Sequence, residues 1–168
     1  YRNCAGGITP WNSWITCEED TSTPNADGQN SDDQMEKEHG YNFEVPAQEQ
    51  VRLTDPWPLK AMGRFRHEAV AVDPRTGIVY QTEDRSDGLL YRFIPSQPGK
   101  LLAGGKLQAL KIKDSLAADT RNFKESRFKV GQKLDVAWVD VRDAESPDDD
   151  LRYQEGFVSV PTQVNNSD

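Results

Sequence analysis

The chain has 168 residues, enough for one domain of ordinary size, with 29% charged residues and a formal net charge of −8. This acidic balance argues against partners such as nucleic acid or an anionic membrane surface, because both need clustered Lys and Arg. No apolar stretch approaches the about 18 residues that cross a membrane. The sequence opens at Tyr1 without a Met or a signal segment, so we expect a mature chain or a piece of a longer one.

The predicted regular elements are short β-strands. In chain order they fall at residues 14–16, 41–45, 66–72, 78–82, 89–94, 107–112 and 136–141. The turn signal Asp-Pro-Arg-Thr-Gly at residues 73–77 makes a hairpin of the strands on either side. Helix signals are weak. The sequence therefore predicts an all-β chain of antiparallel strands with long loops.

Polar stretches divide the chain. Residues 20–39 hold one sizeable apolar residue, Met35, and are expected to form a loop insert. Residues 143–150, which read DAESPDDD, and the stretch after residue 154 also lack core-forming residues. We therefore expect one partial domain over residues 1–154, with residues 155–168 as a loop or disordered tail.

A faint internal repeat links two parts of the chain. One copy comprises residues 14–20 and 40–45, and the other comprises residues 80–84 and 88–93. Each copy reads strand, acidic pair, turn, glycine, strand. Repeated antiparallel strands at this spacing suggest blades of a β-propeller, in which case the chain holds two or three blades of roughly 40–50 residues. The alternative is an ordinary antiparallel meander.

Carboxylates gather at the predicted strand ends. Strict alternation would place Glu68 on the same face as Val70 and Val72, where an acid is costly unless it is paired or bound to a cation. The acidic pairs of the two repeats would converge if the repeats are neighbouring blades. Such acids suit calcium, and an added thiolate suits iron. The candidate cluster comprises Cys4, Glu18, Glu19, Glu68, Glu83 and Asp84. The alternative is a set of solvated turn acids.

Other reactive side chains leave several interpretations open. Cys4 and Cys17 could form a disulfide, remain buried thiols, or include a metal ligand. His67 could be a ligand, a base or a buried strand residue.

The arginines near the acidic pairs have two interpretations. Arg85 follows one acidic pair, and Arg64 and Arg66 flank Phe65. An arginine beside a metal cluster is suited to binding phosphate, because its guanidinium binds two oxygens at once. The alternative for each is an ion pair.

Several motifs in a fixed order resemble the bacterial PhoX alkaline phosphatases. They read NCAGG at residues 3–7, TPW at 9–11, WITCEE at 14–19, HGYNFEV at 39–45, MGRFRHEAVAVDP at 62–74, TEDR at 82–85 and GLLYRF at 88–93. The likeness extends to about residue 154. It implies a six-bladed propeller, of which about two to three blades are present here.

The resemblance also implies a function. Members of the family hydrolyse phosphate monoesters at alkaline pH with an iron (Fe³⁺) pair and calcium. They are exported, usually by the twin-arginine (Tat) route, to the periplasm or the extracellular space. The full protein is expected to be a monomer whose partners are phosphate monoester substrates, with no nucleic acid and no membrane.

The family's site residues carry over onto matching positions of this sequence. The metal ligands implied are Cys4, Glu19, Glu68, Glu83 and Asp84. Arg85 is implied as the catalytic residue, orienting either the phosphate or a neighbouring carboxylate. Cys17 matches no metal ligand, so the resemblance disfavours a Cys4–Cys17 disulfide.

The sequence departs from the family pattern at both ends. The Arg- and Gly-rich motif that the family carries is absent after residue 154. By the resemblance, we expect the N-terminal part of the domain to lie outside this sequence. We therefore expect an internal piece of a metal-dependent phosphatase. Two other functions stay open for the parent protein, a calcium-dependent lactonase-type hydrolase and a calcium-stabilised binding module.

Overall fold

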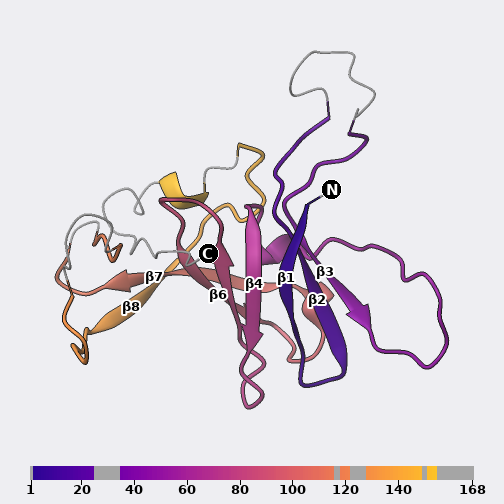
Figure 1. Ribbon diagram of the computed structural model, residues 1–168, viewed down its shortest axis with the longest axis horizontal. Coiled ribbons are helices and arrows are strands. Elements are labelled where there is room, and N and C mark those ends of the chain that lie inside the picture. The colour runs from indigo at the N-terminus through magenta and orange to yellow at the C-terminus, as the bar shows by residue number, and fades with distance from the viewer. Residues whose placement is uncertain (1, 25–34, 116–117, 122–127, 149–150, 155–168) are drawn as a thin grey trace.

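The chain forms one sheet of eight strands in a computed structural model, which describes residues 2–24, 35–115, 118–121, 128–148 and 151–154 (Figure 1). The strands are β1 (Asn3–Ile8), β2 (Ser13–Glu18), β3 (Asn42–Pro46), β4 (His67–Val72), β5 (Val79–Glu83), β6 (Leu90–Pro95), β7 (Gly105–Ile112) and β8 (Val136–Asp140). Short 3₁₀ turns occur at Lys60–Met62, Leu101–Ala103 and Leu151–Tyr153. The described residues contain no α-helix, so the all-β prediction is confirmed.

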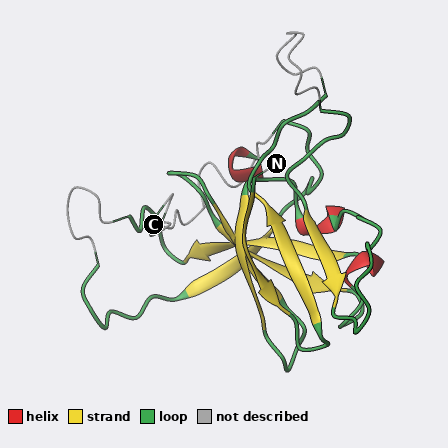
Figure 2. Cartoon of the chain, turned by 45° about the vertical axis from the view of Figure 1, so that its right-hand side comes forward, coloured by secondary structure: helices red, strands yellow, loops and turns green. Residues whose placement is uncertain are grey.

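The sheet consists of two antiparallel parts joined by one parallel contact. Its strand order is β3-β2-β1-β4-β5-β6-β7-β8, and only β1 and β4 pair in parallel, through Gly6 and Ala69. Figure 1 shows β7 and β8 lying across the direction of β1 to β3, and Figure 2 shows the strong twist of the sheet. The sheet does not close on itself, because β3 and β8 form its two edges. The antiparallel expectation therefore holds everywhere except at the junction of the two parts.

Seven of the eight strands coincide with predicted strands, and β1 does not. The β1 sequence, NCAGGI, contains two glycines and offers a weak β signal. Its glycines are needed for close packing. A Cβ on Gly6 would lie 2.2 Å from the Ile15 carbonyl oxygen, and one on Gly7 would lie 2.2 Å from that of Val70. Gly6 and Gly7 thus allow β1 to lie between β2 and β4, and the same two glycines weaken the strand signal of this segment in the sequence.

The core extends along one side of both parts of the sheet. Its largest members include Ile15, Phe65, Tyr91 and Phe93, all fully buried, and the rings of Phe65 and Tyr91 stack at 4.6 Å. Arg64 is also fully buried: its guanidinium donates to the Pro147 carbonyl at 2.7 Å and to the Thr21 carbonyl at 2.5 Å. This arginine therefore fastens two loops to the core rather than contacting an anion.

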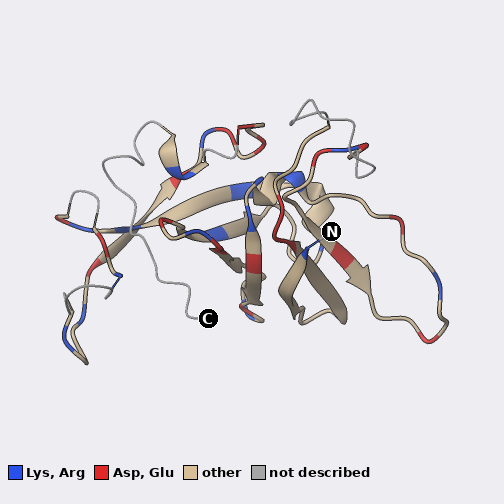
Figure 3. Cartoon of the chain, turned by 45° about the horizontal axis from the view of Figure 1, so that its top comes forward, with Lys and Arg blue, Asp and Glu red and all other residues tan. Residues whose placement is uncertain are grey.

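Charge lies mainly in the loops. Figure 3 shows Lys, Arg, Asp and Glu mostly in the connecting segments, while much of the strand surface is uncharged. The described parts of the predicted insert, residues 20–24 and 35–39, contain no strand or helix. The predicted tail, residues 155–168, lies outside the described residues. Within the described part of the chain, no helix is long and apolar enough to span a membrane.

Candidate functional site

The predicted internal repeat covers the second and third strands of two three-strand units, β1-β2-β3 and β4-β5-β6, and we call each whole unit a repeat. In the first unit Asn3 lies opposite Glu18, and in the second His67 lies opposite Glu83. The register shifts shortly after each of these pairs, between residues 4 and 7 in the first unit and between residues 67 and 70 in the second. The two units therefore carry a similar irregularity near the same end of the strand pair, which supports comparing their positions.

This register aligns the chemistry-bearing residues of the two units. Cys4 directly follows Asn3 in the first unit, and Glu68 directly follows His67 in the second, so Cys4 and Glu68 occupy equivalent positions. Glu19 and Asp84 occupy matching places after β2 and β5. Their amides donate to the carbonyls of residue 2 and residue 66 respectively, each at 2.9 Å. The two units thus bring a thiol or carboxyl and a second acid to equivalent positions.

The first acid of the first repeat, Glu18, holds the backbone. Its Oε2 accepts hydrogen bonds from the amides of Gly40 at 2.9 Å and Tyr41 at 3.1 Å, and its Oε1 lies 2.8 Å from Nδ1 of His39. Glu18 is 8% exposed. It therefore joins the end of β2 to the start of β3, across the loop insert.

The first acid of the second repeat, Glu83, also holds the protein at the end of its strand, through hydrogen bonds from protein donors. Its Oε2 accepts from the Leu89 amide at 3.2 Å and from the Tyr91 hydroxyl at 3.1 Å, and its Oε1 accepts from Nη1 of Arg152 at 3.0 Å. Glu83 is fully buried. Protein donors thus contact both of its carboxylate oxygens. We therefore leave Glu83 out of the proposed metal site, although the sequence predicts it as a ligand.

The second acids, Glu19 and Asp84, meet each other. A hydrogen bond between their side chains is the main reason why the pKa of Glu19 is raised, with burial as the next cause. Arg2 opposes this rise, since its Nη2 lies 2.6 Å from Oε1 of Glu19. Two carboxyl groups so placed share a proton when no cation separates them. The predicted pair is therefore brought together by the fold.

Cys4 and Glu68 join these two acids. Burial is the main cause of the raised pKa of Cys4, and the negative charges of Glu68, Glu19 and Asp84 raise it further. The thiol and three carboxyl groups therefore lie within electrostatic reach of one another. We call Cys4, Glu19, Glu68 and Asp84 the acid cluster.

Cys17 lies opposite Cys4 across the β1–β2 pair. Both cysteines are free thiols, and burial raises the pKa of Cys17 to about 12. The two cysteines are therefore not joined by a disulfide, and the predicted role of Cys4 as a metal ligand stays a prediction.

Glu68 corrects one expectation from the sequence. The register shift between His67 and Val70 breaks the alternation of β4. His67 and Val70 are buried, whereas Glu68 and Ala69 are half-buried. The prediction that Glu68 shares a face with Val70 in regular alternation is therefore wrong. Glu68 interacts with the Cys4 thiol instead of standing in the apolar core.

His67 is a buried strand residue. It is 0% exposed, its ring centroid lies 3.7 Å from that of Phe65, and its Nε2 lies 3.1 Å from the carbonyl oxygen of Gly63. Burial lowers its pKa to about 3, so the imidazole is neutral at physiological pH. The sequence left open whether His67 is a metal ligand, a base or a buried strand residue, and its position matches the last of these.

Arg85 directly follows Asp84 after β5. Its amide donates to the Glu83 carbonyl at 3.0 Å, and its own carbonyl accepts from the Gly88 amide at 2.9 Å. This turn holds the residue next to the acid cluster. The arrangement is compatible with the predicted role of Arg85 in orienting phosphate, which stays a prediction.

The donor chemistry of the acid cluster suits metal ions. A thiolate with carboxylates favours iron, and carboxylates alone favour calcium. Within the described ranges, however, no three His, Cys, Asp or Glu side chains are placed closely enough to hold one ion. The residues therefore fit a metal by their chemistry, while an ion in this arrangement would take fewer than three of its ligands from them.

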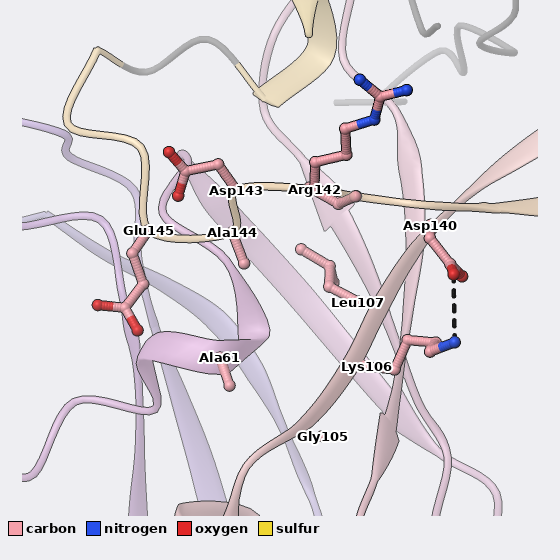
Figure 4. A pocket seen from close by; sticks show the side chains of 10 residues that line it. Ala61, Gly105, Lys106, Leu107, Asp140, Arg142, Asp143, Ala144 and Glu145 are labelled. Atoms are coloured by element: carbon pink, nitrogen blue, oxygen red, sulfur yellow. Dashed lines mark hydrogen bonds and ion pairs between the residues drawn. The ribbon is translucent and has the colours of Figure 1, made fainter. Parts of the chain in front are cut away.

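A separate cavity of about 610 Å³ lies beside β7 and the loop that follows β8 (Figure 4). Its lining includes Lys106 and Asp140, whose charged groups are 3.1 Å apart, and the loop residues Arg142, Asp143 and Glu145. None of the site residues predicted from the sequence lines this cavity. It is therefore distinct from the acid cluster.

Comparison with known proteins places the chain in a family. No curated protein matches the sequence. The solved structure of Pseudomonas fluorescens PhoX in complex with vanadate, a transition state analogue, is similar in fold, with a TM-score of 0.52 at 22% identity. The match covers 83% of this chain but only 30% of that one. A family model described as alkaline phosphatase PhoX matches residues 1–167, and the chain therefore belongs to the PhoX alkaline phosphatase family.

Proposed function

We propose that the protein to which this chain contributes is a metal-dependent alkaline phosphatase that hydrolyses phosphate monoesters. Membership of the PhoX family supports this activity. The single structural observation that carries it is the acid cluster, in which two repeats place a thiol and three carboxyl groups within electrostatic reach. Because the chain spans 30% of the related P. fluorescens structure, the activity is assigned to the whole protein.

The metals proposed are iron and calcium. Cys4, Glu19, Glu68 and Asp84 would hold them, together with groups from outside the described residues. Bound metal ions would supply the positive charge that neutralises the phosphoryl oxygens and activates the oxygen nucleophile. That charge also answers how a chain of net charge −8 binds an anion, because a cation dominates the local field.

The protein's own residues prepare the site. Glu18 and Glu83 hold the strand ends in place through backbone and side-chain donors. The hydrogen bond between Glu19 and Asp84 raises the pKa of Glu19, and a bound cation would offset the repulsion between the two carboxylates. Arg85, held in its turn after Asp84, is proposed to orient the phosphate group. Of these residues, Arg85 would contact the substrate, while the acids would hold the site in place before any bond changes.

The architecture proposed for the whole protein is a six-bladed propeller. The parallel contact between β1 and β4 supports this, because each is the first strand of a repeat and the two run side by side. The remaining blades would lie outside this chain. We further propose that the protein is exported to the periplasm or the extracellular space and works as a monomer.

Elemental analysis of the purified chain tests the metal assignment. We expect iron and calcium to bind, with Cys4→Ser lowering the iron content. Cys17→Ser is the matched control, since Cys17 is the cross-strand neighbour of Cys4 but matches no ligand. Iron content that is unchanged in Cys4→Ser would refute the ligand assignment.

Product analysis of the full-length protein tests the reaction. We expect release of inorganic phosphate from a chromogenic phosphate monoester at alkaline pH, and no turnover of a lactone. Hydrolysis of the lactone alone would refute the phosphatase proposal. Calcium binding without iron and without turnover would favour a binding module.

A further inference from the structure

Two arginines occupy matching places in the two repeats. Arg2 precedes the first residue of β1, and Arg66 precedes the first residue of β4. The carbonyl of each accepts a hydrogen bond from the second acid of its own repeat, Glu19 for Arg2 and Asp84 for Arg66, at 2.9 Å in both cases. The fold therefore fixes both arginine backbones beside the acid cluster in the same way.

The side chains of these arginines differ. Arg2 forms an ion pair with Glu19 at 2.6 Å. For Arg66, Nε is buried without a hydrogen-bond partner among the described residues. The pKa of Asp20 is lowered mainly by hydrogen bonds from Ser22, and the Arg66 charge contributes more weakly. Arg66 is thus a half-buried cation whose Nε donor is not used within the described part of the chain.

Other arginines near the repeats already have partners. Arg64 donates to two loop carbonyls from a fully buried position. Arg152 forms an ion pair with Glu83, and its side chain is 9% exposed. Both hold the fold together. Arg66 lies beside the acid cluster through its backbone but, unlike Arg64 and Arg152, holds no loop or buried acid in place among the described residues.

The geometry points to Arg66 as a substrate-binding residue that contacts an anionic oxygen of the phosphate ester. This inference rests on the proposed function. The acid cluster repels a phosphate group, so a cation held beside it offsets that repulsion where the anion must approach. A guanidinium is well suited, because its planar donors match two phosphate oxygens. An unsatisfied buried donor is also costly, and a bound oxyanion would satisfy it.

Calorimetric titration of inorganic phosphate into the full chain, supplied with calcium and iron, tests this role. We expect Arg66→Gln to weaken binding by about 10- to 100-fold, the loss associated with charge-assisted hydrogen bonds. Arg66→Lys should weaken it less, because it keeps the charge but not the planar fork. Arg75→Gln is the matched control: the Arg75 side chain is 89% exposed and forms an ion pair with its neighbour Asp73 at 3.6 Å.

The outcomes separate this inference from the proposed function. Equal phosphate affinity in Arg66→Gln and the wild type would overturn it, as would the absence of phosphate binding by the wild type. Phosphate binding that depends on Arg66, without ester hydrolysis by the full-length protein, would support the inference and refute the function. Thermal unfolding monitors the fold. If Arg66→Gln does not fold, Arg66→Lys takes its place in the test. Weaker phosphate binding at an unchanged unfolding midpoint would support the inference, and unchanged binding would overturn it.

Discussion

The two repeats share a plan but complete it with different residues. In both, the acid that ends the second strand is buried and accepts one or two backbone hydrogen bonds from the residues just before the third strand. Glu18 adds His39, a local partner, whereas Glu83 adds Arg152, which lies 69 residues further along the chain. The second acid of each repeat points instead to a shared centre. Position in the repeat, rather than residue type, thus decides which acid is structural.

Removing Arg152, the distant partner of Glu83 in the second repeat, should have the largest effect on stability. Arg152→Met leaves the fully buried Glu83 carboxylate without its counter-ion. We expect a loss of about 3–5 kcal/mol in the free energy of unfolding, as for other broken buried ion pairs. Urea denaturation measures it. Lys106→Met is the control, because its pair with Asp140 is more than half exposed and should cost less than about 1 kcal/mol. Equal losses in both variants would contradict the comparison.

The local partner of the first repeat should matter less. Glu18→Gln keeps the shape of the side chain but removes the charge that the Gly40 and Tyr41 amides and His39 contact. We expect a loss of about 1.5–3 kcal/mol, the range for hydrogen bonds to a charged group. Chemical denaturation beside Glu145→Gln, an exposed acid 3.6 Å from Lys60, provides the reference. A loss no larger than that of the reference would mean that the first repeat is not fastened in this way.

The smallest effect on stability is expected in the acid cluster, where Glu19 and Asp84 lie. A raised pKa of Glu19 in the folded state means that its contribution to stability is complete below the ordinary glutamate pKa and is lost as pH rises through the folded value. The metal-free chain should therefore lose stability as pH rises above about 4.5. Asp84→Asn removes one of the two charges, so it should flatten this dependence and change stability at pH 4 by only about 0.5 kcal/mol.

Thermal unfolding across this pH range, with the metals removed, measures the slope. Asp140→Asn is the control, because Asp140 is an exposed acid with a lowered pKa, caused mainly by its hydrogen bond from Gln108. A lowered pKa acts in the opposite direction, since its stabilising contribution is lost as pH falls. A slope that Asp84→Asn leaves unchanged would mean that Glu19 and Asp84 do not share a proton.

Much of the fold could be predicted because β-prone runs ending at turns are local signals. Seven strands and the strand–acid–glycine repeat are visible in this way. β1 escaped prediction because its close neighbours require glycine, which carries no strand signal. The altered face of Glu68 escaped because a register shift depends on the partner strand.

The candidate site was predictable only in part, for the same reason. Residue types and spacing indicated which acids could act, and the resemblance to PhoX supported Cys4, Glu19 and Glu68. They did not distinguish Glu83 from Asp84, because the difference depends on Arg152 at a sequence separation of 69 residues. They also did not separate the buried Arg64 from Arg66, since both flank the same phenylalanine.

The sequence by itself determined the all-β class, the position of most strands, the repeat and the family. Those features follow from local propensity and from motifs in a fixed order. Only the tertiary structure decided which acids hold the backbone, which acids meet, and which arginines hold loops or a buried acid in place. Those outcomes depend on pairing between distant segments, where the register of β1 against β4 and the packing of Arg152 on Glu83 set the contacts.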